Sequence, residues 1–228
     1  MRLQATCAAL AAALATLAAA GAASAQEAEF SFNAAVSSDY VFRGFSQTLE
    51  EPAVSAGMDL TWGSLYGGAW VSNVDFGDST DAEIDFYGGI RGEASGFAFD
   101  FGAIGYAYTN VPAGVDYSYV EFKAAASRAV GPATVGAALY VSPDFFGADE
   151  EATYAEVNAS FTPAEKWTVS SAVGQQWLDV SDDYVTWNAG VSYALTDNLI
   201  ADVRYHDTDV ENVAIADGRV VGTIKVVF

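Results

Sequence analysis

The sequence has few basic residues, one histidine (His206) and one cysteine (Cys7). Nine Lys and Arg stand against 30 Asp and Glu, which gives a net charge of −21. Such an acidic chain repels nucleic-acid phosphates, so we expect no nucleic-acid partner. A paired set of Cys and His ligands, a G-x-S-x-G motif and an H-E-x-x-H motif are all missing. We therefore expect no metal site, no cofactor and no enzymatic activity.

The first 25 residues have the pattern of a cleaved export signal. Arg2 provides a positive start, residues 5–20 are uncharged, and Ala23-Ser24-Ala25 is a small-x-small cleavage site. The uncharged run is too short to span a bilayer comfortably, which argues against a membrane anchor. We expect a signal peptide over 1–25 and a mature domain over 26–228. Loss of Arg2 takes the net charge from −21 to −22.

From residue 29 onward, segments of about ten residues alternate apolar residues with polar or small ones, as strands with two unlike faces do. Outside the export signal, no segment of helical length keeps an apolar stripe at the helical period. The mature chain is therefore predicted to be all-β. Twelve strands are expected, over residues 29–37, 53–62, 65–76, 82–92, 97–108, 117–129, 133–142, 153–161, 167–177, 184–195, 199–207 and 219–228.

The connections between these strands alternate between short and long. The short ones are 63–64, 93–96, 130–132, 162–166 and 196–198, and the long ones are 38–52, 77–81, 109–116, 143–152, 178–183 and 208–218. An antiparallel up-and-down transmembrane β-barrel has this rhythm, with tight periplasmic turns and larger outer loops. A soluble β-sandwich mixes loop lengths at both ends. We therefore predict a barrel of about 12 strands in the outer membrane of a Gram-negative cell.

One face of the predicted strands is almost wholly apolar and is expected to contact lipid, as with Phe97, Phe99 and Phe101. The segment 65–76 has two mixed faces, so its pattern does not show which face is inward. Aromatic residues near strand ends are expected to form girdles at the membrane interfaces. They are Trp62, Tyr66, Phe97, Tyr108, Trp167, Trp177 and Tyr193.

The opposite face carries the charged residues and is expected to line the lumen. Near the membrane midplane, Arg or Lys on the lipid face costs about 2–4 kcal/mol, which explains why mid-strand charges keep to one parity. Asp59, Glu156 and His206 also have this parity. Eight charged residues are candidates for the lumen or a constriction: Asp85, Arg91, Asp100, Glu121, Lys123, Asp202, Arg204 and Lys225.

The stretch after the first strand reads Ser37-Ser38-Asp39-Tyr40-Val41-Phe42-Arg43-Gly44-Phe45-Ser46-Gln47. It closely resembles the S-S-D-Y-x-F-R-G-x-S-Q signature of the proteobacterial TorF-type porin family. The resemblance covers the mature chain and implies an outer-membrane barrel with a channel role and no established substrate. The last strand, which ends in Phe228, also looks like the assembly signal of such barrels. This implies the barrel-assembly machinery as a partner.

The motif residues allow two interpretations. Asp39 can close an Asx-type turn on nearby backbone amides, and Gly44 permits a backbone angle that other residues resist. Arg43 is then available to pair with Asp39 or with an inward carboxylate. In one interpretation, the segment only bends the chain and caps the barrel rim. In the other, it takes a direct part in the pore mouth.

The charged lumen predicts a channel for passive diffusion of small polar solutes or ions. Twelve strands enclose a wider space than the roughly eight-stranded barrels that side chains fill. Arg91, Lys123, Arg204 and Lys225 are expected to form a constriction, and the acidic loops are expected to favour cations at the mouth. These loops also suit weak divalent cations, shared with lipopolysaccharide phosphates.

A closed structural or adhesive barrel is an alternative. Its lumen would be filled by ion pairs, which need a complete network to offset the cost of desolvation. Arg91 would pair with Asp85 or Asp100. Lys123 would pair with Glu121 or with a cross-strand carboxylate.

A barrel hydrolase is a further alternative, with His206 as the base. Asp207 follows it directly, but neighbouring residues on a regular strand point to opposite faces. Asp207 is therefore not expected to orient the imidazole. In every interpretation the expected surroundings are outer-membrane lipid and lipopolysaccharide.

Overall fold

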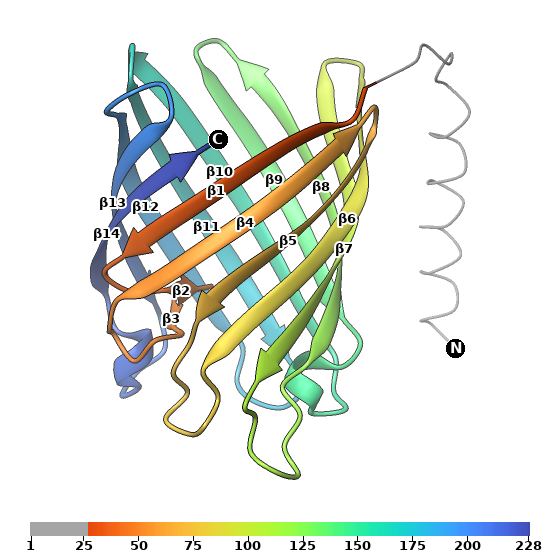
Figure 1. Cartoon of the computed structure of the whole chain (residues 1–228), viewed down its shortest axis with the longest axis vertical. Coiled ribbons are helices and arrows are strands. Elements are labelled where there is room, and N and C mark those ends of the chain that lie inside the picture. Colours follow the sequence, from red (N-terminus) through yellow and green to blue (C-terminus); the bar gives the residue numbers. More distant parts are fainter. Residues whose placement is uncertain (1–26) are drawn as a thin grey trace.

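The computed structural model describes residues 27–228, which form one closed barrel of 12 antiparallel strands (Figure 1). Each barrel strand pairs with the one before and the one after it, and β1 closes the ring by pairing with β14. The expected signal peptide lies outside the described residues. The barrel strands are β1 (Glu29–Ser37), β4 (Ala53–Trp62), β5 (Leu65–Asn73), β6 (Ala82–Ala94), β7 (Phe97–Thr109), β8 (Tyr119–Val130), β9 (Ala133–Ser142), β10 (Ala152–Ala164), β11 (Trp167–Leu178), β12 (Tyr184–Ala194), β13 (Leu199–Thr208) and β14 (Arg219–Val227).

All the predicted strands are present, and their ends move by no more than three residues. The strand predicted over 65–76 ends early, at Asn73, because the chain turns away from the sheet there. The Asp75 backbone amide donates to the Gln47 carbonyl at 2.8 Å, outside the barrel ladder. The Asp75 carboxylate accepts from the Gly77 amide at 2.8 Å and closes a local turn.

The outer wall of the barrel is apolar and well exposed. Phe86, Val220 and Phe228 are 63%, 65% and 71% exposed, although all three are large hydrophobic residues. The charged positions of the same strands face the lumen. Apolar residues outside and polar residues inside is the arrangement of a transmembrane barrel. Among the described residues, no helix is long and apolar enough to cross a membrane.

The orientation of β5, which the pattern left open, is clear in the structure. Leu65 and Val71 are exposed on the outer wall. Tyr66 faces the lumen, where its hydroxyl donates to Asp100 at 2.7 Å. Trp70 also faces inward and lies edge-on to Tyr40 at 5.3 Å. These inward aromatic rings break the simple alternation because they have partners inside the barrel.

For two of the seven residues predicted to lie in the aromatic girdles, the prediction was wrong. Tyr66 lies in the lumen, and so does Tyr108, whose ring packs on Phe76 at 5.5 Å. Trp62 and Trp167, by contrast, are exposed on the outer wall near the short turns. Proximity to a strand end therefore did not separate interfacial rings from rings of the lumen.

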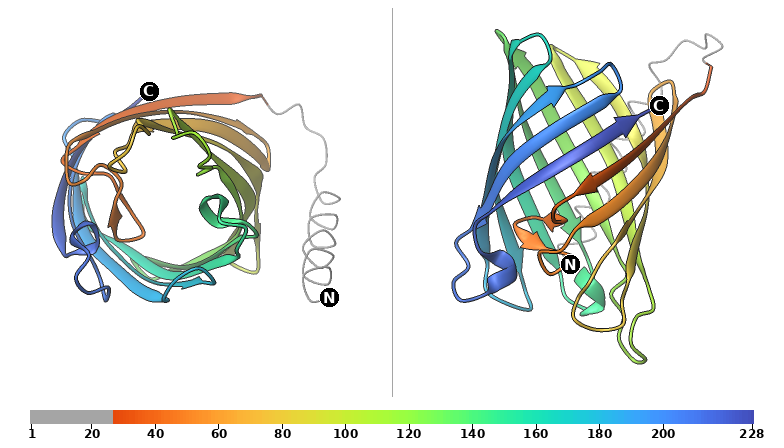
Figure 2. Two further views of the ribbon diagram at one scale, coloured as in Figure 1. Left: turned by 90° about the horizontal axis from the view of Figure 1, so that it is seen from below. Right: turned by 60° about the vertical axis from the view of Figure 1, so that its left-hand side comes forward.

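The connections sort by length between the two ends of the barrel (Figure 1). Residues 63–64, 95–96, 131–132, 165–166 and 195–198 form the short-turn end, and residues 38–52, 74–81, 110–118, 143–151, 179–183 and 209–218 form the long-loop end. The first long loop contains β2 (Val41–Phe42) and β3 (Phe45–Ser46), and the fourth contains the short 3₁₀ turn η1 (Phe145–Gly147). Seen along the barrel axis, β2, β3 and η1 lie within the ring of strands (Figure 2). A second 3₁₀ turn, η2 (Ala214–Ala216), precedes β14.

Glutamate-specific proteolysis of intact cells should identify the outward end. We expect cleavage after Glu150, Glu151 or Glu211, which are exposed in long loops, and none after Glu165, which is also exposed but lies in a short turn. Permeabilised cells should be cut at Glu165 as well, which controls for its intrinsic susceptibility. If the protein in intact cells is cleaved at Glu165 alone, the short-turn end faces outward and our orientation is wrong. Mass spectrometry of the fragments provides the measurement.

Candidate functional site

The inward hairpin, which we define as residues 41–46, crosses the lumen from the β1 side. Its two-residue turn consists of Arg43 and Gly44, with φ of 47° and 91°. Positive φ at both central residues is typical of the type I′ turn that joins two tightly paired strands. A Cβ on Gly44 would meet the Thr208 methyl group and would lie 2.7 Å from the Thr186 hydroxyl. The turn therefore needs glycine both for its backbone angle and for its close approach to β12 and β13.

The Arg43 guanidinium is the polar centre of the lumen. It donates to both Glu121 carboxylate oxygens, at 2.7 and 2.8 Å, and to the Gln176 side-chain oxygen at 3.1 Å. The side chains of Arg43 and Glu121 are only 7% and 2% exposed. The rings of Tyr140 and Tyr154 lie 5.1 and 4.3 Å from the guanidinium carbon. A bidentate, charge-assisted pair between aromatic rings fixes the hairpin tip on the opposite wall.

Asp39 holds the base of the hairpin. It accepts from the hydroxyls of Ser46 and Thr48, at 2.7 and 2.9 Å, and pairs with Arg219 of β14 at 3.1 Å. The predicted Asx turn on backbone amides is therefore replaced by bonds to side chains. Arg43 pairs with an inward carboxylate, which was one of its two expected partners. The interpretation in which this motif only caps the rim is wrong, because its tip lies inside the barrel (Figure 2).

Most of the remaining motif residues connect this segment to the wall, and Gln47 makes a bond within it. The Ser38 amide donates to the Gly222 carbonyl at 2.9 Å, and the Tyr40 hydroxyl donates to Glu83 at 2.7 Å. Phe42 lies edge-on to Tyr106 at 6.1 Å. Gln47 bonds to the Phe45 carbonyl through its side-chain amide at 3.1 Å.

The charged lumen candidates lie in separate groups. Arg91 and Lys123 share Asp100, at 3.2 and 2.9 Å, toward the short-turn end. The Arg91 guanidinium also lies 3.9 Å from the centre of the Tyr66 ring. Arg91 and Lys123 therefore form ion pairs of the kind that the closed-barrel alternative predicts.

A second group lies on the wall formed by β12 and β13. Arg204 pairs with Asp202 at 3.3 Å and donates to Asn188 and Ser170 at 2.8 Å each. Ser192 also donates to Asp202, at 2.6 Å. The four basic residues of the expected constriction thus lie on different parts of the wall, in β6, β8, β13 and β14, and their joint role as a constriction stays a prediction.

Asp85 and Lys225 belong to a third region. They line a cavity of about 390 Å³ together with Asp59, Tyr87 and Trp70. One carboxylate oxygen of Asp85 is buried with no hydrogen-bond partner among residues 27–228. The Tyr87 hydroxyl donates to Asp59 at 2.6 Å across the same cavity.

Two more cavities lie on the lumen side of the inward hairpin. One, of about 540 Å³, is lined by Arg91, Asp100, Lys123 and Glu156. The other, of about 270 Å³, is lined by Arg43 and His206 among others. The lumen is thus hollow below the hairpin, and charged side chains of both signs face that space.

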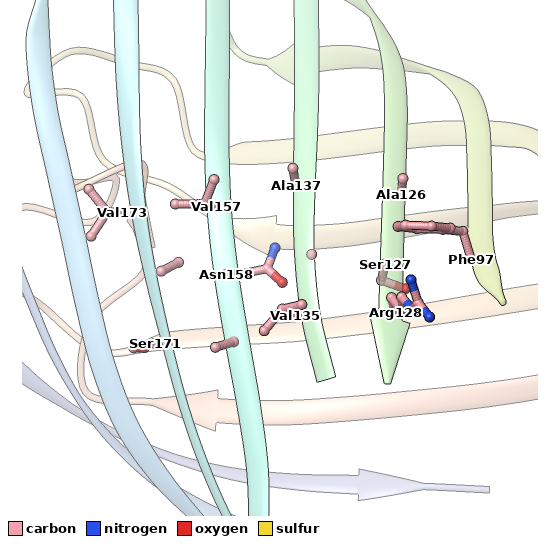
Figure 3. Close-up of a pocket in the computed structure, with 13 residues that line it drawn as sticks. Phe97, Ala126, Ser127, Arg128, Val135, Ala137, Val157, Asn158, Ser171 and Val173 are labelled. Carbon is pink, nitrogen blue, oxygen red and sulfur yellow. The ribbon is translucent and has the colours of Figure 1, made fainter. Parts of the chain in front are cut away.

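Another hollow lies at β7 to β11 (Figure 3). Its volume is about 680 Å³, and its most exposed lining residues, Val157 and Val173, belong to the outer wall. Arg128 lies beside it, with its guanidinium 5.1 Å from the Phe97 ring. Because small and apolar side chains dominate this surface, we assign it to the lipid-facing wall.

His206 and Asp207 point to opposite faces, as expected. His206 lines the lumen, whereas Asp207 accepts from the Tyr205 hydroxyl at 2.7 Å on the other face. Within residues 27–228, no three His, Asp and Glu side chains are placed to hold a metal ion. Weak divalent binding at the acidic loops remains a prediction that needs ligands from a second molecule, such as lipopolysaccharide phosphates.

The neutral partners of Arg43 were not among the residues expected from the sequence. Tyr140, Tyr154 and Gln176 surround its guanidinium, yet they carry no charge and were absent from the candidates. Arg219 was missed because it lies at the first residue of β14. All of them have the inward parity, so a search for inward polar and aromatic residues would have found them.

The chain belongs to a bacterial family of unknown function, Gcw_chp, whose family model matches residues 19–227. None of the curated proteins compared with the chain matches it. The KdgM porin has a similar structure, with a TM-score of 0.60, 8% identity, and coverage of 87% of this chain and 98% of the porin. The COG4313 outer membrane channel from Pseudomonas putida F1 gives a TM-score of 0.50 at 10% identity, with coverage of 91% and 97%. At these identities the likeness establishes the barrel fold.

Proposed function

We propose that this member of a family of unknown function is an outer-membrane channel for passive diffusion of small polar solutes or ions. The observation that carries the proposal is a closed barrel with an apolar outer wall whose charged lumen stays hollow beneath an inward hairpin. The porin and channel with similar folds support it, and so does the resemblance of the opening motif to TorF-type porins. No catalytic role is proposed.

The inward hairpin is the element that sets the width of the passage. Its tip is fixed to the far wall, so solutes must pass beside it rather than through an empty ring. Charges of both signs line the space below, and they select solutes by sign as well as size. Diffusion of this kind requires only a continuous polar path.

Conductance of the refolded mature protein in a planar bilayer tests the proposal. We expect discrete single-channel steps from protein that migrates as a folded barrel when it is not heated. Heat-denatured protein is the matched control and should give none. Absence of steps from folded protein at every salt concentration and voltage would overturn the channel function.

Selectivity should depend on the basic pair near the short turns. Replacing Arg91 and Lys123 with Gln leaves Asp100 without its cationic partners, so the lumen becomes more negative. We expect the cation-to-anion permeability ratio to rise by roughly twofold or more. Reversal potentials in a salt gradient measure this ratio, and an unchanged ratio would contradict our placement of this pair along the passage.

The Glu150→Gln/Glu151→Gln variant is a control at the mouth. These carboxylates are exposed in a long loop, so salt screens their effect over about 10 Å at 0.1 M. We expect lower cation conductance at low salt and no change at high salt. An equal effect of both variants at every salt concentration would contradict the division between mouth and lumen.

A closed structural barrel is the second candidate function. The buried Arg43–Glu121 pair and the two ion pairs on Asp100 favour it, because they fill the lumen with the kind of network that a plug requires. Conductance separates the two functions. If the barrel is plugged, the wild-type protein shows no conductance, and conductance appears only after the inward hairpin is removed.

A further inference from the structure

A hollow of about 410 Å³ lies at the long-loop end, on the opposite side of the inward hairpin from the lumen cavities. Four connections that are far apart in sequence contribute aromatic rings to it. We call it the aromatic vestibule. The six rings that these connections contribute are Phe42, Phe45, Phe76, Tyr117, Phe145 and Phe146, and Tyr184 of β12 adds a seventh.

The rings of the vestibule pack edge to face rather than into a closed core. Phe76 lies 5.4 Å from Tyr117 at an interplanar angle of 87°, and Phe145 lies 5.0 Å from Phe146 at 80°. All four are half-buried. Aromatic surface left in contact with water at a channel mouth is unfavourable until an apolar body covers it.

The backbone of η1 is held in an uncommon conformation that places these rings. Phe146 has φ of 52°, a left-handed angle that bulky residues rarely adopt. Gly147 allows the turn to approach the neighbouring loop, since a Cβ there would meet the Asp116 carbonyl oxygen. The Phe146 ring stacks on Tyr119 of the barrel wall at 4.8 Å. Local strain at a ring that faces a hollow is typical of a ligand site.

The charge around the vestibule is negative. Asp75 is exposed and lines it, and among residues 27–228 no Lys or Arg does. Asp78 lies beside it, where its carboxylate accepts from the Tyr117 hydroxyl at 2.9 Å and from the Thr80 amide at 2.7 Å. The Thr80 amide, together with Tyr117, holds the pKa of the Asp78 carboxyl below its ordinary value. Asp78 therefore remains an anion at neutral pH.

The floor of the vestibule does not repel a cation strongly. Arg43 lies beneath Phe42, with its guanidinium carbon 4.7 Å from the ring centre. Its charge is compensated by the bidentate contact with Glu121. A positive ligand above Phe42 therefore meets ring faces and carboxylates rather than a free guanidinium.

We propose that the aromatic vestibule binds small organic cations, such as quaternary ammonium compounds with an apolar body. Ring faces carry negative electrostatic potential and attract such cations, while their apolar groups cover the exposed rings. Inorganic cations are strongly hydrated and carry no apolar groups to cover the rings, and organic anions are repelled by Asp75 and Asp78. The binding requires no conduction, so it stands independently of the proposed channel function.

Calorimetric titration of the folded barrel in detergent tests the inference, with empty micelles as the blank. Phenyltrimethylammonium is the probe, and benzoate and glucose are the anionic and neutral comparisons. We expect phenyltrimethylammonium to bind at least about tenfold more tightly than either. Phe146→Leu keeps an apolar side chain but removes a ring face, and it should weaken binding about three- to tenfold. Asp75→Asn should weaken the binding of phenyltrimethylammonium but should not weaken that of benzoate or glucose.

Phe86→Leu is the matched control, because Phe86 is an exposed ring on the outer wall and should leave binding unchanged. Unheated migration on gels verifies that each variant is folded. Equal or tighter binding of glucose would identify a carbohydrate site and overturn the cation assignment. Lack of binding at 10 mM, on the order of the weakest affinities of interest, or equal binding by Phe146→Leu would also overturn it.

Discussion

Replacing Arg43 with Ala should release the inward hairpin and raise single-channel conductance. The substitution leaves the Glu121 carboxylate, whose side chain is 2% exposed, without its cationic partner. Breaking a buried pair in this way costs about 3–5 kcal/mol, because it leaves an uncompensated buried charge. We expect the hairpin to leave the far wall and conductance to rise by roughly twofold or more.

A double variant separates the loss of the pair from the loss of the hairpin contacts. In Arg43→Met/Glu121→Gln neither member of this pair leaves an unpaired charge buried. The amide oxygen introduced at position 121 would still accept from the Tyr106 hydroxyl, which bonds to Glu121 at 3.0 Å. Stability against denaturant should therefore return close to that of the wild type. The conductance of this double variant should lie between that of the wild type and that of Arg43→Ala. Wild-type conductance and stability in Arg43→Ala would show that this pair does not fix the hairpin.

Replacing Phe228 with Asp should reduce the amount of assembled barrel at least about tenfold, because the new charge lies at the lipid-facing terminus. Phe228 is 71% exposed on the outer wall, and its backbone exchanges two hydrogen bonds with Phe32, at 3.1 and 2.8 Å. The residue thus extends the seam where the first and last strands meet. Heat-modifiable protein in outer-membrane fractions measures assembly.

Phe30→Asp distinguishes a terminal assembly signal from a general penalty on lipid-facing charge. Phe30 is 61% exposed on β1, near the same end of the barrel. If the terminal position is read by the assembly machinery, Phe30→Asp should assemble better than Phe228→Asp. An equal loss of assembled barrel in the two variants would show that the cost of placing a charge in lipid accounts for both, with no terminal signal.

The barrel could be predicted from the sequence because each strand carries its own signal. Alternation along a strand fixes which residues face lipid, and a closed up-and-down barrel needs only neighbouring strands to pair. β5 was the exception. Tyr66 and Trp70 are inward rings, and their partners Asp100 and Tyr40 lie elsewhere in the chain.

The inward course of the first long loop could not be predicted in the same way. Arg43 is separated from Glu121 by 78 residues and from Gln176 by 133, so no local pattern marks the contact. In the sequence, the type I′ turn is marked only by Arg43-Gly44, and this pair would also suit a turn at the rim of the barrel. Selecting candidates by charge also excluded Tyr140 and Tyr154, although these rings flank the guanidinium.

Residues 38–39, which lead from β1 into the inward hairpin, also bear on how firmly the barrel is closed. The ladder between β1 and β14 registers five residue pairs, from Asn33–Val227 to Ser37–Thr223, whereas β6 and β7 register 13. Immediately beyond that short ladder, Ser38 bonds to Gly222 and Asp39 pairs with Arg219. The short segment that precedes the inward hairpin thus also fastens the first strand to the last. Lateral opening of the wall toward lipid, at the junction with the fewest rungs, requires this segment to detach first.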